Sequence, residues 1–474
     1  MTGQSMAFPQ ELAEHYISEG LWQRETLDTW LARAVAARPD APAIIHPGGE
    51  VSYAEFAKQV SHVAAGLADL GLERGDVITT QLPNIVEFLV AHLAIARIGA
   101  VHQTIHMPYG PADIEFHLAH SKAKAIITIP MLKDLDLAAV MMGLRAKLPD
   151  LKHVIVIGEA PEGTLSFASL RNSAKPPLLE GPAEARDACM LLYTSGTTSN
   201  PKGVPLSFQN LLCNALDGAN EFGFTADDRI LSAAPFSHLY GIYNFHAALI
   251  KGAAAVLLPV FTPPDLAARV TATQPSVMFL APAHAAAIIG MGLMEAHDFS
   301  SVRFTVFSGA ACPVPLLKKY HSFIPESRIA QLWGMTEIVA GCFSRPSDSI
   351  ETAATTAGPV ARGNEIRVLD PDGATLPAGE EGDLQVRGPS VFAGYLDNAD
   401  ANAEAFTEDG WFRTGDLAVI DDAGYVRLTG RSKDIINRGG IKYNPADIEA
   451  LLLRHDKIDQ AAIVPMPDDT LGER

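Results

Sequence analysis

The sequence has few cysteines and no long uninterrupted apolar run. Its 474 residues include four cysteines, none in a C-x-x-C pair, which argues against a zinc ribbon and a secreted disulfide scaffold. Residues 1–6 lack a basic and apolar leader, and charged side chains interrupt the most apolar helical stretch, 85–101. We therefore expect a cytoplasmic protein without a transmembrane segment.

Positive charge is also scarce, since 36 Lys and Arg face 55 Asp and Glu and give a formal net charge of −19. Such a field repels phosphate backbones, so nucleic acid is not expected as a partner. A nucleotide is still compatible with it, because a local group of backbone N–H donors can hold a small anion. The motifs G-x-G-x-x-G, H-E-x-x-H and G-x-S-x-G are absent, which removes their usual enzyme classes.

Four histidines lie close together in the sequence. Pro108 and Pro111 divide the segment, and no carboxylate or cysteine completes a ligand set, so packing is favoured over metal binding. The four are His102, His106, His117 and His120.

Short apolar strands alternate with helical segments along most of the chain. Helices are expected at 27–37 and 54–70, and strands at 76–81, 124–129, 152–157, 230–234, 254–259 and 277–280. This alternation predicts layered α/β architecture with mostly parallel strands.

The pattern changes near residue 364, where two alternating strands, 365–369 and 383–387, follow one another around turn residues. We therefore expect a large N-terminal domain of layered α/β subdomains over 1–430. It includes a small β-rich, barrel-like subdomain at about 350–430. Residues 431–474 then begin a small α+β C-terminal domain that is incomplete.

A glycine-rich loop follows the strand-like run 191–193, and it reads Thr194-Ser195-Gly196-Thr197-Thr198-Ser199-Asn200-Pro201-Lys202-Gly203. Glycine lets the backbone approach a phosphate closely, hydroxyls donate hydrogen bonds, and lysine adds a positive charge. The loop is not a Walker-type P-loop, because Pro201 stands where the second glycine belongs. It is nevertheless typical of a polyphosphate cradle.

This loop resembles the phosphate loop of the adenylate-forming superfamily, which includes acyl- and aryl-CoA synthetases, aryl-acid ligases, peptide adenylation domains and beetle luciferases. Further segments resemble the family's other motifs in the family's order: 235–241, 308–311, 331–337, 410–416, 430–434 and 437–443.

The resemblance implies a role for each motif. His238 borders the carboxylate pocket, Trp333 stacks on adenine in place of the usual tyrosine, and Thr336 contacts the α-phosphate. Glu337 coordinates Mg²⁺, Asp416 binds ribose, Lys433 is the interdomain hinge, and 439–440 line a thiol tunnel. The implied catalytic residues are Thr194, Lys202, His238, Thr336, Glu337 and Lys433. The implied nucleotide- and CoA-binding residues are Thr194, Ser195, Gly196, Thr197, Thr198, Lys202, Gly309, Ala310, Ala311, Gln331, Leu332, Trp333, Gly334, Met335, Thr336, Asp416, Arg431, Gly439 and Gly440.

The activity implied is that of an ATP-dependent carboxylic acid ligase that uses ATP, Mg²⁺ and coenzyme A. It forms an acyl-adenylate and then an acyl-CoA thioester. The pocket candidates are mostly apolar, which favours a hydrophobic acyl or aryl acid. They are His238, Tyr240, Ile242, Tyr243, Asn244, Ser308, Gly309, Gly334, Met335, Val339 and Ala340.

One departure from the family keeps alternatives open. Family members continue with a segment that supplies an adenylation lysine, and no Pro-Lys-x-x-x-Gly-Lys-like segment follows Lys457. We expect that the sequence is truncated. The alternatives are a ligase that loads a carrier protein, a luciferase-like oxidative enzyme and a nucleotide-binding protein without ligase activity. The oligomeric state is not readable, so a homo-oligomer is left open.

Overall fold

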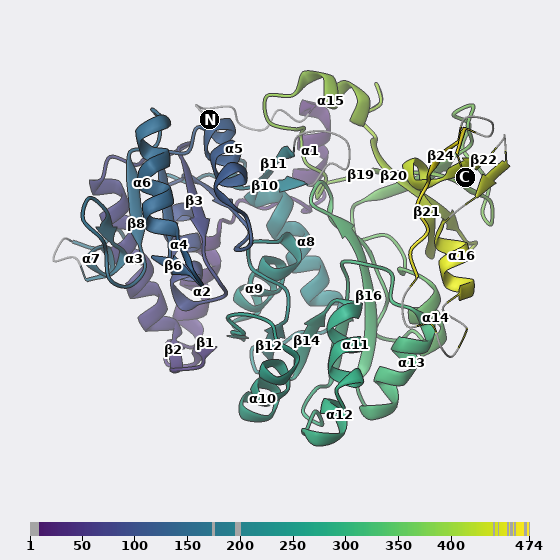
Figure 1. Cartoon of the computed structure of the whole chain (residues 1–474), viewed down its shortest axis with the longest axis horizontal. Helices are drawn as coiled ribbons and strands as arrows, with labels where there is room; N and C mark the ends of the chain where they lie inside the picture. The colour runs from purple at the N-terminus through teal and green to yellow at the C-terminus, as the bar shows by residue number, and fades with distance from the viewer. Residues whose placement is uncertain are drawn as a thin grey trace.

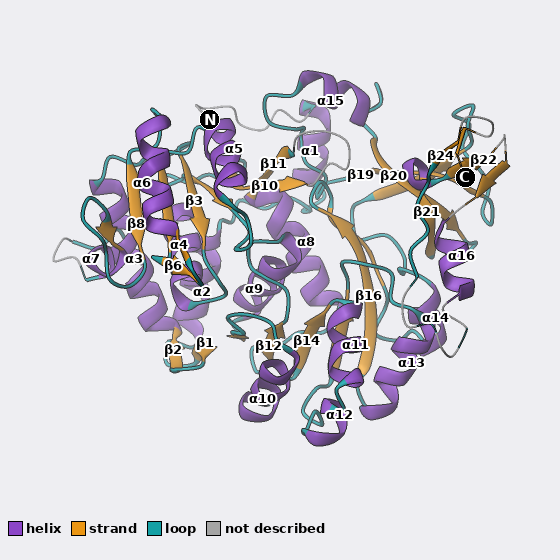
Figure 2. Ribbon diagram, in the orientation of Figure 1, coloured by secondary structure: helices purple, strands orange, loops and turns teal. Residues whose placement is uncertain are grey.

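The computed structural model describes residues 9–172, 176–194, 201–438, 441–443, 445–452, 455, 458, 461–468 and 472–473. Two large sheets form its body, with helices between and outside them (Figures 1 and 2). Within the described part of the chain, every helix is too short or too polar to cross a membrane.

The first sheet confirms the predicted parallel pairing. Its strands, in spatial order, are β11 (Lys202–Ser207), β10 (Ala188–Thr194), β4 (Val101–Thr104), β3 (Val77–Gln81), β5 (Ala125–Thr128), β8 (His153–Val156) and β9 (Leu165–Ser166). All neighbours run parallel except β10 and β11, which form an antiparallel pair at the edge.

The second sheet is built in the same way. Its order is β17 (Val339–Phe343), β16 (Arg328–Met335), β15 (Phe304–Phe307), β14 (Val277–Leu280), β12 (Arg229–Ser232), β13 (Ala254–Val256), β1 (Pro42–His46) and β2 (Gly49–Ser52). Only the two edge pairs, β16–β17 and β1–β2, are antiparallel among these strands.

Three apolar clusters show that the helices form layers on these sheets. The central cluster joins both sheets through α2 (Leu27–Ala37), α3 (Tyr53–Asp69), α4 (Val86–Arg97), α7 (Phe167–Arg171), α8 (Phe208–Glu221) and α9 (Leu239–Lys251). The outer face of the first sheet carries α5 (Pro111–Ser121) and α6 (Leu137–Lys147). That of the second sheet carries α10 (Pro263–Thr273), α11 (Pro282–Gly290), α12 (Leu293–Ala296), α13 (Val314–Phe323) and α14 (Ile350–Thr355). The predicted layered α/β architecture is therefore confirmed.

The β-rich unit is a four-stranded antiparallel sheet in the order β18 (Glu365–Leu369), β19 (Glu381–Arg387), β20 (Phe412–Ile420) and β21 (Val426–Arg431). A 3₁₀ turn, η1 (Ser432–Asp434), leads to β22 (Ile436–Arg438), β23 (Ile441–Tyr443), α16 (Pro445–Leu452), β24 (Pro467–Asp468) and β25 (Gly472–Glu473). The remaining elements are α1 (Gln10–Ser18), the hairpin β6–β7 (Met131–Leu132 and Leu135–Asp136) and α15 (Ala399–Ala405).

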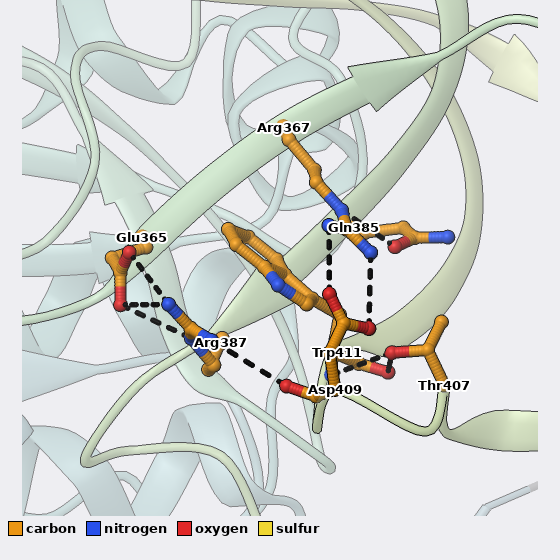
Figure 3. A network of polar contacts seen from close by, with 7 residues as sticks. All are labelled: Glu365, Arg367, Gln385, Arg387, Thr407, Asp409 and Trp411. Atoms are coloured by element: carbon orange, nitrogen blue, oxygen red, sulfur yellow. Dashed lines mark hydrogen bonds and ion pairs between the residues drawn. The ribbon is translucent and has the colours of Figure 1, made fainter. Parts of the chain in front are cut away.

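A tryptophan between two arginines fixes the loop that enters β20 (Figure 3). The Arg367 and Arg387 guanidinium carbons lie 4.3 and 4.8 Å from the Trp411 ring centroid. Arg387 also pairs with Glu365, the residue opposite it on β18, and Arg367 pairs with Asp409. Because Trp411 is 7% exposed, these cation–π contacts are largely shielded from water.

Three histidines form a buried chain across the central layer. His102 on β4 lies 2.8 Å (Nδ1 to Nδ1) from His92 on α4, and His92 Nε2 lies 2.9 Å from His246 Nε2 on α9. Thr80 Oγ1 closes the other end, 2.8 Å from His102 Nε2. Burial lowers the pKa of His102 and His246 to about 3 and that of His92 well below its usual value, and repulsion among the rings adds to the shift for His92 and His102.

We predict that the three buried, hydrogen-bonded histidines make the stability of the fold sensitive to acid. In the unfolded protein these histidines take up protons near pH 6.5, whereas in the folded protein they stay neutral to much lower pH. Stability should therefore be greatest above pH 6.5 and fall below it, by up to about 1.4 kcal/mol per pH unit for each histidine. Urea unfolding at pH 7 and pH 5 measures how the free energy of unfolding changes with pH. His246→Gln should reduce by about one the number of protons taken up on unfolding, and so make this pH dependence weaker. Replacement of the exposed His15 by Gln is the control, and an equal flattening there would contradict the assignment.

Candidate active site

A cavity of about 650 Å³ lies where the carboxyl ends of strands from both sheets meet. Residues after β4, β15 and β16, the end of β10 and the start of α9 line it. Parallel α/β sheets place ligands at this edge, because the loops that follow the strands gather there. The charged side chains among the described lining residues are Lys202, Glu337 and Arg431.

The residues at the two ends of the glycine-rich loop lie at this cavity. β10 ends at Thr194 and β11 begins at Lys202, and the two residues are direct partners in the antiparallel pair. Both line the cavity. The loop residues between them that the sequence singled out lie outside the described residues: Ser195, Gly196, Thr197 and Thr198.

Glu337 is a buried carboxylate in the cavity wall, 7% exposed. Burial raises its pKa, against the hydrogen bond from Tyr395 and the attraction of Lys202 and Arg431. The Tyr395 hydroxyl donates to Glu337 Oε1 at 2.9 Å, and the Lys202 ammonium lies 4.8 Å from the Tyr395 ring centroid. Sequence reasoning missed Tyr395, which belongs to none of the segments chosen by resemblance.

The predicted adenine turn has the expected small side chains. Gly309 follows β15 with φ +86°, a left-handed conformation that favours glycine, and it lines the cavity. Ala310 and Ala311 are exposed beside it. Gln331 holds the turn in place, since its Oε1 accepts from the Cys312 N–H at 3.0 Å. Leu332, Gly334, Met335 and Thr336 also line the cavity.

Trp333 lies behind this wall, because alternate residues of β16 point to opposite faces. Its indole N–H donates to Asp416 Oδ2 at 3.0 Å, and the other oxygen of Asp416 accepts from Arg431 Nε at 3.1 Å. Gly341 leaves room for the indole, since an added Cβ there would meet the ring at 2.4 Å. In this structure Trp333 contacts the predicted ribose carboxylate, and its stacking on adenine remains a prediction.

Histidine and tyrosine side chains form part of the remaining cavity wall, among aliphatic and uncharged polar residues. The Tyr240 N–H donates to His238 Nδ1 at 3.2 Å, so the neutral ring carries its proton on Nε2. Burial lowers the pKa of His238 and lowers that of His106 to about 4. These two rings are nearly parallel, 6.2 Å apart, and Tyr109 and Tyr193 line the cavity with them.

Two pocket candidates lie elsewhere on α9. Ile242 belongs to the central core, and the Asn244 side-chain amide donates to the Gly241 carbonyl. His106, Tyr109 and Tyr193 take their place in the wall. The clustered spacing of His102, His106, His117 and His120 could have signalled this wall, since His106 lines it and His120 Nδ1 bonds the Tyr193 hydroxyl at 2.8 Å.

The predicted hinge follows the cavity directly. Arg431 and Ser432 line the cavity, and Lys433 lies in η1, although its side chain is outside the described residues. Gly439 and Gly440 also lie outside the described residues. Among the described residues, no group of three or more His, Cys, Asp or Glu side chains is placed to hold a metal ion.

The two-sheet body, with a cavity at the carboxyl ends of its strands, defines a layered α/β protein with a site for a small molecule. Comparison with known proteins specifies its family. The model of a family described as AMP-binding enzyme matches residues 31–396. The chain therefore belongs to the AMP-binding enzyme family.

Two curated relatives and one solved structure illustrate the similarity. The chain is 30% identical to a medium-chain fatty-acid–CoA ligase of Escherichia coli (strain K12), over 99% of this chain and 83% of that enzyme. It is 31% identical to 4-coumarate–CoA ligase 5 of Oryza sativa subsp. japonica, over 94% and 83%. The crystal structure of the anthranilate CoA ligase AuaEII with anthranoyl-AMP aligns with a TM-score of 0.86 and 26% identity, over 94% of this chain and 85% of that chain.

We predict that Lys202→Ala weakens ATP binding by about 1–3 kcal/mol, the range for a charge-assisted contact to phosphate. Isothermal titration calorimetry measures this loss directly. Lys318→Ala is the matched control, since that ammonium pairs with the exposed Glu351 at 2.6 Å on the outer helix layer. Unchanged ATP affinity in Lys202→Ala would remove this residue from the phosphate site.

Proposed function

We propose that the protein is an ATP-dependent carboxylic acid ligase. It forms an acyl-adenylate from a hydrophobic acyl or aryl acid and then an acyl-CoA thioester, with release of pyrophosphate and AMP. The observation that carries this proposal is one cavity with two kinds of wall. Lys202, Glu337 and Arg431 supply its charges, and the histidines and tyrosines that follow β4 and β12 or lie at the end of β10 supply an uncharged wall.

In the first half-reaction, a carboxylate oxygen attacks the α-phosphorus of ATP, and the bond from that phosphorus to the bridging oxygen breaks. Lys202 and Thr194, with the loop between them, hold the β- and γ-phosphates. Thr336 contacts the α-phosphate, and Asp416 accepts hydrogen bonds from ribose. This chemistry depends mainly on positioning and on charge neutralisation, which suits a site with few covalent participants.

Glu337 is suited to bind a Mg²⁺ ion that is also bound by the phosphates of a nucleotide. Mg²⁺ is usually bound by one or two carboxylates together with phosphate oxygens and water, not by a full protein cage. A single buried carboxylate near a lysine matches that arrangement. When bound, the ion neutralises phosphate charge.

In the second half-reaction, a thiol attacks the acyl carbonyl and AMP leaves. The resemblance assigns the hinge to Lys433 and the thiol tunnel to Gly439 and Gly440. The position of the hinge supports this assignment, because Lys433 directly follows Arg431 and Ser432 in the cavity wall. Rotation there would exchange the residues that face the adenylate.

The acid should carry a single charge. In the wall formed by His106, Tyr109, Tyr193, His238 and Tyr243, the histidines are neutral at pH 7 because burial lowers their pKa values. A second carboxylate or an ammonium group on the substrate would lose its hydration there without an ionic partner.

We predict that the full-length protein releases pyrophosphate with monocarboxylic aryl or acyl acids and forms a thioester only when CoA is added. Malonate and phenylalanine, which carry an extra charge, should give less than a tenth of that rate. Coupled pyrophosphate detection and mass spectrometry of the products measure both steps. ATP binding without release for any acid would favour the nucleotide-binding alternative.

We also predict that Glu337→Gln raises the Mg²⁺ concentration needed for half-maximal activity by about tenfold or more, because a neutral amide is a weaker ligand for a hard cation. A magnesium titration at saturating ATP measures the change. Glu351→Gln, on the exposed outer layer, is the control. A variant whose activity has the wild-type dependence on Mg²⁺ would exclude Glu337 from the metal site.

A further inference from the structure

The segment 392–396 connects Glu337 to Gly203, at the end of the glycine-rich loop. At one end, the Phe392 N–H donates to the Glu337 carbonyl at 2.8 Å. At the other end, the Leu396 N–H donates to the carbonyl of Gly203, the residue after Lys202, at 2.9 Å. The backbone of this segment therefore joins two parts of the site that lie 134 positions apart in the sequence.

The side chain of Tyr395 joins the same two parts a second time. Its hydroxyl donates to Glu337 Oε1, and its ring lies under the Lys202 ammonium. The hydroxyl donates to one oxygen of the carboxylate and leaves its negative charge in place. The ring face attracts the ammonium through its quadrupole and does not neutralise the positive charge.

The backbone of Tyr395 is itself held on both sides by one amide. The Tyr395 N–H donates to Asn402 Oδ1 at 2.6 Å, and Asn402 Nδ2 donates to the Tyr395 carbonyl at 3.1 Å. Asn402 lies on α15, outside the cavity wall. Gly394 has φ +137°, and a Cβ there would meet the Asn402 side chain at 3.1 Å. The local structure thus fixes where the tyrosine stands.

We propose that Tyr395 is a positioning residue that holds Lys202 and Glu337 at the spacing which Mg²⁺-bound ATP requires. This inference rests on the proposed function. The phosphates of one nucleotide must reach the lysine while their bound cation reaches the carboxylate, so the spacing of these two groups decides whether both contacts form together. Hydrogen-bond partners of metal ligands typically change metal affinity by about 10- to 100-fold.

Two substitutions separate the two contacts. Tyr395→Phe removes the hydroxyl on Glu337 and keeps the ring under Lys202. We expect metal-free ATP affinity to stay within about twofold, while the tightening of ATP binding by Mg²⁺ falls by about tenfold. Tyr395→Leu also removes the ring, so metal-free ATP affinity should fall about threefold or more.

Isothermal titration calorimetry with ATP, in EDTA and in saturating Mg²⁺, measures both affinities on the full-length protein without reliance on turnover. Tyr425→Phe is the matched control, because it removes a 2.6 Å tyrosine–carboxylate hydrogen bond to Asp348 away from the cavity. Asn402→Ala tests the support of Tyr395, and it should reduce the Mg²⁺ effect several-fold. In the double variant, Asn402→Ala should reduce the Mg²⁺ effect on ATP affinity little beyond the loss in Tyr395→Phe alone, because both substitutions act through the Tyr395 side chain. Urea midpoints check that each variant folds.

The outcomes separate this proposal from the function on which it rests. An unchanged or stronger Mg²⁺ effect in Tyr395→Phe overturns the positioning role, as does an equal loss in Tyr425→Phe. If Tyr395→Phe does not fold, an unchanged Mg²⁺ effect in Asn402→Ala overturns it. If the wild-type protein binds no ATP with or without Mg²⁺, the proposed ligase function fails first.

Discussion

The arrangement of the two sheets depends on a layer of helices between them that is buried on both of its faces. In α4, every residue from Phe88 to Arg97 is buried, and in α9 so is every residue from Leu239 to Ile250. A polar group in such a layer must find its partner inside the protein, because leaving it unpaired costs about 1–3 kcal/mol. The hydrogen bonds that link Thr80, His102, His92 and His246 give the histidine nitrogens partners. The Arg97 guanidinium binds Asp28 and Ser61.

The same layer explains where the cavity lies. Because it is packed against both sheets, the carboxyl ends of their strands come together, and polar contacts then join the loops across the gap. Thr104 Oγ1 donates to the Ser237 carbonyl at 2.7 Å, and Asn84 Oδ1 accepts from the Phe236 N–H at 2.7 Å. These contacts join the end of β4 and the loop after β3 in the first sheet to the loop that leads from β12 of the second sheet into α9. The position of His238 is therefore set by residues more than 100 positions away.

Local patterns in the sequence predicted the elements well and the contacts between them only in part. The helix Leu27–Ala37 has the predicted bounds because its apolar spacing is strong. Ile242 and Asn244 were included in the predicted pocket because the whole segment was taken together, whereas a helix turns only some of its side chains toward one wall. Tyr395 could not be predicted, because its partners Glu337 and Lys202 lie 58 and 193 positions away in the sequence.

The electrostatics of the site follow from placing a buried acid beside two cations in a protein of net charge −19. In the proposed function, the Lys202 and Arg431 charges would attract the phosphates of ATP, and local cations can do this because ions in solution screen the distant acidic surface over about 10 Å. Glu337 opposes the same phosphates when no cation lies between them. A nucleotide that brings its own divalent cation turns that repulsion into attraction. In the proposed function, the buried carboxylate would therefore make the site discriminate between free ATP and its magnesium complex, which lysine and arginine alone would not do.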